Sequence, residues 1–62
     1  MTDRYPDVTE RLHKRGSYRV QRVNADTELW FNPEKNRHFA VAVPLSDAHA
    51  DRIIREEFDG HL

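Results

Sequence analysis

The spacing of hydrophobic residues changes along the chain from a helical period to alternation, and then back to a helical period. Near the N-terminus, Tyr5, Val8 and Leu12 recur at i, i+3 and i+7, which places them on one side of a helix. We therefore predict a helix over residues 7–15 with one narrow apolar stripe. Gly16 follows directly and can adopt the positive φ that commonly ends a helix.

Three alternating runs come next, and each predicts a strand. They read SYRVQRV over residues 17–23, TELWFN over 27–32 and RHFAVAV over 37–43. The separating segments NAD and PEKN consist of typical turn residues. Because both connections are short, we expect consecutive strands to pair as an antiparallel meander.

A second helical period begins after Pro44, which should end the last strand. Ser46 is a suitable N-cap, because its hydroxyl can accept a hydrogen bond from a free backbone N–H of the first turn. The apolar residues between Ala50 and Phe58 then recur at helical spacing. We predict a helix that runs to about Phe58 and is closed by Gly60.

The predicted fold class is α+β, with the order α-β-β-β-α in a single domain, residues 1–62. Each helix has only one apolar stripe, so both should pack on the same face of the sheet. The predicted core consists of Val8, Leu12, Tyr18, Val20, Leu29, Phe31, Phe39, Val41, Val43, Ile53, Ile54 and Phe58. This register leaves Trp30 on the uncovered face as a candidate protein-binding residue. A slip of one residue would exchange Trp30 with Phe31.

Composition narrows the class of protein. The chain has 62 residues and no cysteine, which excludes disulfides and thiolate metal sites. Its longest apolar stretch, FAVAVPL, is far shorter than the roughly 20 residues needed to span a membrane. The segment MTDRYPD lacks the basic start and apolar centre of a signal peptide. We therefore expect a cytoplasmic protein without a membrane partner.

Charge is nearly balanced in total but not along the chain. Ten Lys and Arg residues face eleven Asp and Glu residues, giving a formal net charge of −1. The acidic excess lies in residues 44–62, so the preceding part could carry a basic stripe that contacts RNA phosphates. A solvated surface of mixed charge explains the same composition. The candidate RNA-binding residues are Arg19, Arg22, Lys35 and Arg37.

Few residues suggest catalysis or metal binding. The sequence has no phosphate-binding glycine loop, no G-x-S-x-G and no H-E-x-x-H. Asp47, His49 and Asp51 alternate in the last predicted helix, where residues i and i+2 point about 200° apart and cannot meet at one ion. We predict no cofactor and no metal. His38, the one histidine on the predicted sheet, is either a general acid or base or an ordinary polar strand residue.

Several segments, taken together, resemble the HicA family, the small toxins of bacterial and archaeal toxin–antitoxin pairs. The first predicted helix and strand read RLHKRGSYRVQR, and the strand ends in Arg22. The second strand ends in an aromatic residue, the third closes in FAVAVP, and the last helix has an isoleucine pair before its acidic end in ADRIIRE. The resemblance covers nearly the whole chain.

The resemblance implies a fold similar to that of double-stranded-RNA-binding domains and a ribonuclease activity on mRNA. It also implies a HicB-like antitoxin as protein partner. Family members use a histidine at the start of the second strand, and the matching position here is Thr27. Threonine cannot act as a general base at neutral pH, so the implied mechanism lacks its central group unless His38 replaces it.

Three hypotheses remain open from the sequence. The first is a HicA-like toxin that acts on mRNA, with an altered or degenerate catalytic group. The second is a non-catalytic module or small inhibitor on the same fold, which binds a protein through the face that carries Trp30 or through the acidic last helix. The third is a non-catalytic RNA binder, whose affinity would fall steeply with salt concentration.

Overall fold

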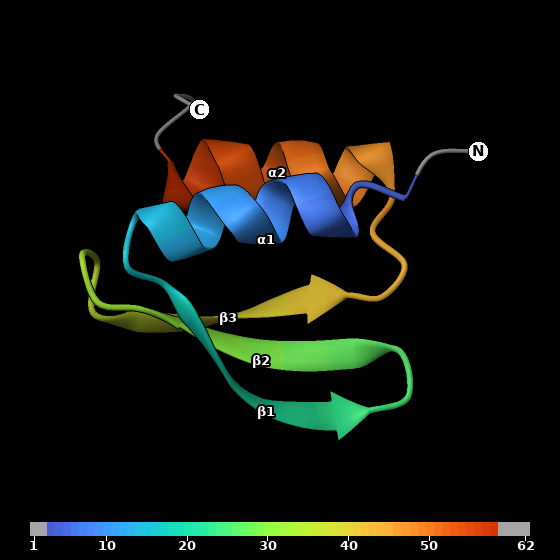
Figure 1. Ribbon diagram of the computed structural model, residues 1–62, viewed down its shortest axis with the longest axis horizontal. Helices are drawn as coiled ribbons and strands as arrows, with labels where there is room; N and C mark the ends of the chain where they lie inside the picture. Colours follow the sequence, from blue (N-terminus) through green and yellow to red (C-terminus); the bar gives the residue numbers. More distant parts are fainter. Residues whose placement is uncertain (1–2, 59–62) are drawn as a thin grey trace.

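The computed structural model describes residues 3–58 and confirms the predicted order of helices and strands (Figure 1). The elements are α1 (Tyr5–Lys14), β1 (Tyr18–Asn24), β2 (Thr27–Asn32), β3 (Arg37–Ala42) and α2 (Asp47–Glu57). The three strands form one antiparallel sheet in the order β1-β2-β3. Both helices lie on the same side of this sheet, so the fold is a two-layer α+β arrangement, as expected.

Helix α1 begins at Tyr5, two residues before its predicted start. The Asp3 carboxylate accepts hydrogen bonds from the backbone N–H groups of Tyr5 and Leu45, both at 2.9 Å. These two bonds hold the pKa of Asp3 below its ordinary value. At the other end Gly16 takes a φ of 92°, and the N–H of the next residue returns to the Leu12 carbonyl at 2.9 Å. The predicted helix end at this glycine is therefore confirmed.

Helix α2 begins as the sequence predicts. The Ser46 hydroxyl accepts a hydrogen bond from the His49 backbone N–H at 3.2 Å, which confirms Ser46 as the N-cap. The helix ends at Glu57, and Phe58 follows as its C-cap. Gly60, the predicted terminator, lies outside the described residues.

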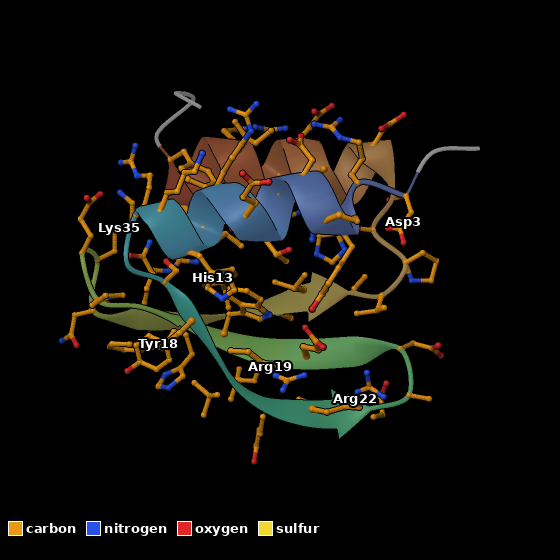
Figure 2. All side chains as sticks on the ribbon, in the orientation of Figure 1. Asp3, His13, Tyr18, Arg19, Arg22 and Lys35 are labelled. Carbon is orange, nitrogen blue, oxygen red and sulfur yellow. The ribbon has the colours of Figure 1, made fainter. Side chains whose placement is uncertain are left out.

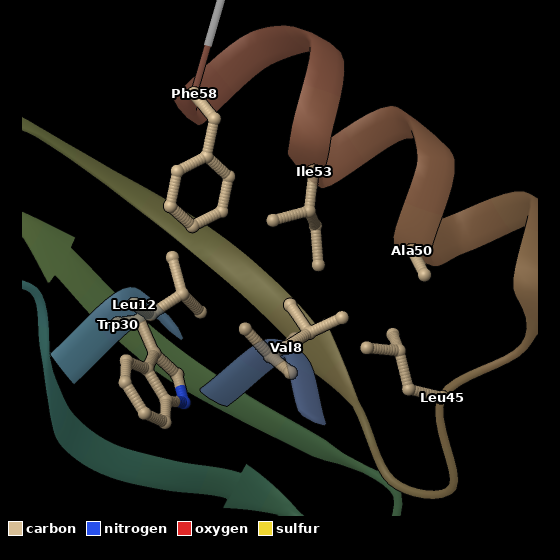
Figure 3. Close-up of a cluster of buried hydrophobic side chains, with 8 residues drawn as sticks. Val8, Leu12, Trp30, Leu45, Ala50, Ile53 and Phe58 are labelled. Atoms are coloured by element: carbon tan, nitrogen blue, oxygen red, sulfur yellow. The ribbon is translucent and has the colours of Figure 1, made fainter. Parts of the chain in front are cut away.

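The core fills the space between the two helices and the sheet. Figure 3 shows Trp30 beside Leu12, with side chains of α2 reaching toward them from the opposite side. The buried cluster consists of Val8, Leu12, Trp30, Val41, Leu45, Ala50, Ile53 and Phe58. Of these, Trp30, Leu45 and Ala50 were absent from the predicted core. Phe39 and Ile54 pack against the cluster as partly buried residues.

The predicted faces of β2 are wrong. Glu28, Trp30 and Asn32 are buried on the helix side, whereas Leu29 and Phe31 are only partly buried on the other side. Trp30 is 1% exposed, so it does not lie on the uncovered face. The alternation itself was predicted correctly, and the strand is turned over by one position.

Strand β1 also differs from the prediction, because the helices do not cover it. All seven of its residues are exposed, so Tyr18 and Val20 do not belong to the core. Its pairing with β2 shifts register after Arg19 and again after Arg22, which leaves Val20 and Val23 without a direct partner. Each shift has the form of a β-bulge, in which two residues oppose one.

Hydrogen bonds explain why β2 can bury its polar residues. The Asn32 amide donates to Glu57 at 2.9 Å, and its oxygen accepts the backbone N–H of Glu34 at 3.0 Å. Arg37 approaches the other oxygen of Glu57 at 3.4 Å. Within residues 3–58 no buried side-chain nitrogen or oxygen lacks a partner. The desolvation of these groups is therefore offset by bonds inside the protein.

Candidate functional site

The side of the sheet that faces away from the helices is the candidate functional surface, and we call it the open face. It consists of Tyr18, Val20, Gln21, Val23, Asn24, Thr27, Leu29, Phe31, His38, Ala40 and Ala42. The first bulge sets Val20 beside Gln21 opposite Leu29, and the second adds Val23 in the same way. None of these side chains is a lysine, arginine, aspartate or glutamate.

An aromatic row crosses the open face at one end of the sheet. Phe31 on β2 pairs with Tyr18 on β1 and with His38 on β3. Its ring centroid lies 5.8 Å from that of Tyr18 and 4.9 Å from that of His38, with both pairs tilted. Tyr18 is 50% exposed, so a partner can reach the row. Such rings can pack against a protein surface or against nucleic-acid bases.

The two catalytic candidates lie on the open face but are not brought together. Thr27 pairs with Ala42 at one end of the sheet, whereas His38 pairs with Phe31 at the other. Thr27 and Phe31, the partner of His38, are four positions apart on β2, which corresponds to roughly 14 Å along the strand. His38 therefore cannot supply a base at the position of Thr27 without a large rearrangement.

The four candidate RNA-binding residues do not form a single patch. Figure 2 shows Arg22 near one end of β1 and Lys35 at the opposite end of the molecule. Arg37 lies against α2, where it pairs with Glu56 and Glu57 at 3.6 and 3.4 Å. Only Arg19 and Arg22 lie close to each other, because both reach one carboxylate. The four residues therefore do not form a continuous basic stripe.

That carboxylate belongs to Glu28, which lies at the centre of a polar cluster that was not predicted from the sequence. Its Oε1 accepts hydrogen bonds from the Tyr5 hydroxyl at 2.6 Å and from the Trp30 indole N–H at 3.1 Å. Its Oε2 lies 3.4 Å from Arg19 and 3.9 Å from Arg22. We call these five residues the Glu28 cluster.

The protonation states of the Glu28 cluster follow from these contacts. Burial raises the pKa of Glu28, but hydrogen bonds from Tyr5, Trp30 and Arg19 outweigh it and leave the pKa below its ordinary value of 4.5. Burial, together with the bond to Glu28, raises the pKa of Tyr5. At neutral pH the cluster thus holds an ionised carboxylate and a phenol that donates to it. The sequence indicated only that Glu28 and Trp30 are two positions apart on a predicted strand, so that their side chains share a face.

Trp30 belongs to the interior and not to a binding surface. The centroid of its indole ring lies 5.1 Å from that of the His13 ring on α1 and 6.5 Å from that of Phe39 on β3, with both pairs tilted. The expectation that Trp30 is exposed is therefore wrong, and the protein-binding role based on that exposure loses its foundation. Among residues 3–58, the exposed large apolar side chains are instead Tyr18, Val20 and Val23 of β1.

Two shallow hollows on the helix side are lined mainly by charged residues. One of about 260 Å³ lies between the helices, where Asp7 pairs with Arg11 and Glu10 pairs with Lys14. The other, of about 180 Å³, lies between β3 and α2, and its lining includes the Arg37 ion pairs with Glu56 and Glu57. Most of the charges that border the two hollows already have ion-pair partners, so neither hollow indicates a ligand.

Residues 3–58 contain no group of three histidine, aspartate or glutamate side chains that could hold a metal ion, Asp47, His49 and Asp51 included. In that range no helix combines the length and the apolar character that crossing a membrane requires.

No protein-family model, curated protein or solved structure matches this chain. The resemblance to HicA toxins therefore stays a prediction.

Proposed function

We propose that this protein is a non-catalytic module that binds another protein through the open face of its sheet. The observation that carries the proposal is the composition of that face, which is uncharged and crossed by the row Tyr18, Phe31 and His38. The centres of protein–protein interfaces are likewise depleted of charge and enriched in aromatic residues.

The exposure of β1 supports the same proposal. Tyr18, Val20 and Val23 are 50%, 47% and 55% exposed, and all three belong to one short strand. Single exposed apolar residues are common on protein surfaces, but a contiguous group beside Leu29 and Phe31 is typical of an interaction site.

The occupant that fits is a protein surface that is itself apolar and uncharged at its centre. A charged group pressed against the open face would lose its hydration and would find no opposite charge among the face residues. A nucleic-acid strand would bring phosphates to a face that offers them no cation. The open face therefore fits a protein partner better than RNA.

A catalytic function receives less support from the geometry. His38 pairs with Phe31, four positions along β2 from Thr27, so the two side chains cannot act as partners. The HicA-type ribonuclease therefore rests on the sequence resemblance alone.

One observation favours a second candidate, the binding of single-stranded RNA. Bases can stack on aromatic rings spaced across neighbouring strands, and Tyr18 and Phe31 offer such rings. Binding of this kind would depend on Tyr18 and Phe31 and would weaken steeply with added salt.

Photo-crosslinking tests the proposal directly. A photoreactive phenylalanine derivative is placed at Tyr18 on the open face and, as a control, at Glu10 on the exposed side of α1, and crosslinks are formed in cells. We expect one defined protein to be joined at position 18 and not at position 10. The purified partner should then bind the native chain but not the variant Tyr18→Lys. RNA joined at position 18 would favour the second candidate, and a crosslink to the chain itself would identify a second copy as partner.

A further inference from the structure

The Glu28 cluster contains a buried anion whose partners face outward. Glu28 is 2% exposed, while the Arg19 and Arg22 side chains that reach it are 55% and 59% exposed. Burying a carboxylate is costly, and it is tolerated here because Tyr5 and Trp30 donate to it from inside the protein. Glu28 thereby fixes two guanidinium groups side by side at the surface.

The two arginines share a single carboxylate, and this leaves one positive charge in excess. In the other arginine ion pairs, the carboxylates are at least as many as the arginines: Arg15 pairs with Glu34, and Arg37 pairs with two glutamates. Arg19 and Arg22 each contact only one oxygen of Glu28, at 3.4 and 3.9 Å, so most of their N–H donors remain directed elsewhere. Two guanidiniums in this position are prepared to bind a further anion.

We propose that Arg19 and Arg22 form a clamp for a carboxylate side chain of the protein partner, an inference that rests on the proposed function. Both arginines belong to β1, the edge strand that also carries Tyr18, Val20 and Val23. Their side chains lie on the helix side of the sheet, because Arg19 pairs with Trp30 and Arg22 with Glu28. A partner that covers the open face must therefore wrap around the β1 edge to meet the clamp at the rim of the interface. Interface rims are polar, and charge pairs there guide association and set orientation.

A protein carboxylate fits the surroundings better than an RNA phosphate does. The other two candidate phosphate contacts, Lys35 and Arg37, are not beside the clamp, and Arg37 already pairs with two glutamates. A strand of RNA would therefore meet one cationic point and no continuation, whereas a single acidic side chain needs only that point.

A titration of the full chain, labelled with ¹⁵N and followed by NMR, tests the clamp without the partner. The probe is the peptide acetyl-Glu-Glu-Glu-Glu-amide, and its glutamine counterpart is the matched control. The acidic peptide should shift the side-chain N–H signals of Arg19 and Arg22 and the indole N–H signal of Trp30, which reports on Glu28. The glutamine peptide should shift none of them. The absence of shifts with the acidic peptide would overturn the clamp.

Variants separate binding from folding. Arg19→Gln and Arg22→Gln should each weaken the acidic peptide about tenfold, the loss expected for one hydrogen bond to a charged group. Arg19→Lys keeps the charge near Glu28 and should retain part of the affinity. Arg11→Gln on α1, where Arg11 pairs with Asp7, is the matched control and should bind as the native chain does. Unchanged binding by the first two variants, with native far-UV circular dichroism, would overturn the proposal.

Two further measurements distinguish the source of the anion and the failure of each proposal. If tetrauridylate shifts the same signals at lower concentration than the peptide, the clamp belongs to a nucleic acid and the carboxylate assignment is overturned. With a crosslinked partner in hand, Arg22→Gln should weaken its binding about tenfold and reduce the salt dependence. If the partner binds Arg22→Gln normally but rejects Tyr18→Lys, the clamp fails while the proposed function stands. If the peptide binds but no protein crosslinks at position 18, the assignment to a partner fails together with the proposed function.

Discussion

The two faces of the sheet differ in a way that hydrophobicity does not predict. On β2 the inner face buries Glu28 and Asn32 together with Trp30, whereas the outer face leaves Leu29 and Phe31 partly uncovered. The polar residues of the inner face are satisfied by hydrogen bonds, whereas no helix or strand within residues 3–58 covers the apolar residues of the outer face. A strand can therefore bury its more polar side when the fold supplies partners for each polar atom.

The largest side chain explains much of this choice. An indole removes more apolar surface from water than a leucine side chain does, and its N–H must find an acceptor when it is buried. Glu28, two residues earlier on the same face, is that acceptor. Turning the strand over would expose Trp30 and leave the helices packed on smaller groups.

Truncation of the inner face should have the largest effect on stability. Trp30→Ala should lower the free energy of unfolding by about 3–5 kcal/mol, because it leaves a cavity between the sheet and the helices. Leu29→Ala, on the outer face of the same strand, should cost about 1 kcal/mol, because its side chain is only partly buried. Urea unfolding followed by far-UV circular dichroism measures both. Equal losses would mean that the two faces are packed alike.

Removal of the buried carboxylate should have the next largest effect. Glu28→Ala should lower the free energy of unfolding by about 2–3 kcal/mol, because the Tyr5 hydroxyl and the Trp30 indole lose their acceptor inside the protein. Glu34→Ala removes an exposed ion pair with Arg15 and should change it by less than about 0.5 kcal/mol. A loss at Glu34 as large as that at Glu28 would contradict the importance of the buried bonds.

The same carboxylate makes the stability of the folded protein depend on pH. The folded-state pKa of Glu28 lies below its ordinary value, so its contribution is present above about pH 4.5 and is lost as the pH falls through the folded-state pKa. Tyr5 has a raised pKa, so its contribution is present below its ordinary value of 10.0 and is lost at higher pH. The urea midpoint should thus stay level between these limits and fall on both sides. Glu28→Gln should reduce the loss of stability in acid. The pKa of Asp3 is also lowered, so Asp3→Asn measures how much of that loss Asp3 contributes.

Changes confined to the outer face should affect stability least. Phe31→Thr should cost about 1 kcal/mol, since it removes ring contacts with Tyr18 and His38 but no fully buried contact. The same variant should abolish crosslinking from position 18 to the partner. Native binding by Phe31→Thr would show that the aromatic row is not part of the interface.

Local signals made most of the fold predictable from the sequence. Ser46 and Gly16 mark a helix start and a helix end whose hydrogen bonds depend on neighbouring residues alone, and the structure confirms both. The strand spans were equally readable, since alternation and turn residues are local features. The start of α1 was missed because Asp3, which accepts the Tyr5 N–H at the start of the helix, is also held by Leu45, 42 residues away.

The candidate site was less predictable, because it depends on which face of each strand is covered. Alternation tells which residues share a face but not which face meets the helices. For β2 that choice depends on Tyr5, which is 23 residues from Glu28, and on Glu57, which is 25 residues from Asn32. The bulges of β1 likewise follow from its pairing with β2 and leave no trace in the alternation of SYRVQRV.

These bulges also restrict how another molecule can approach. A regular edge strand presents evenly spaced N–H and C=O groups to which a second chain can add a strand, and this is a common route to aggregation. On β1 that spacing is broken twice within seven residues. The strand can therefore display Tyr18, Val20 and Val23 without serving as a template for sheet extension, and contact at this edge must be made by side chains rather than by backbone pairing.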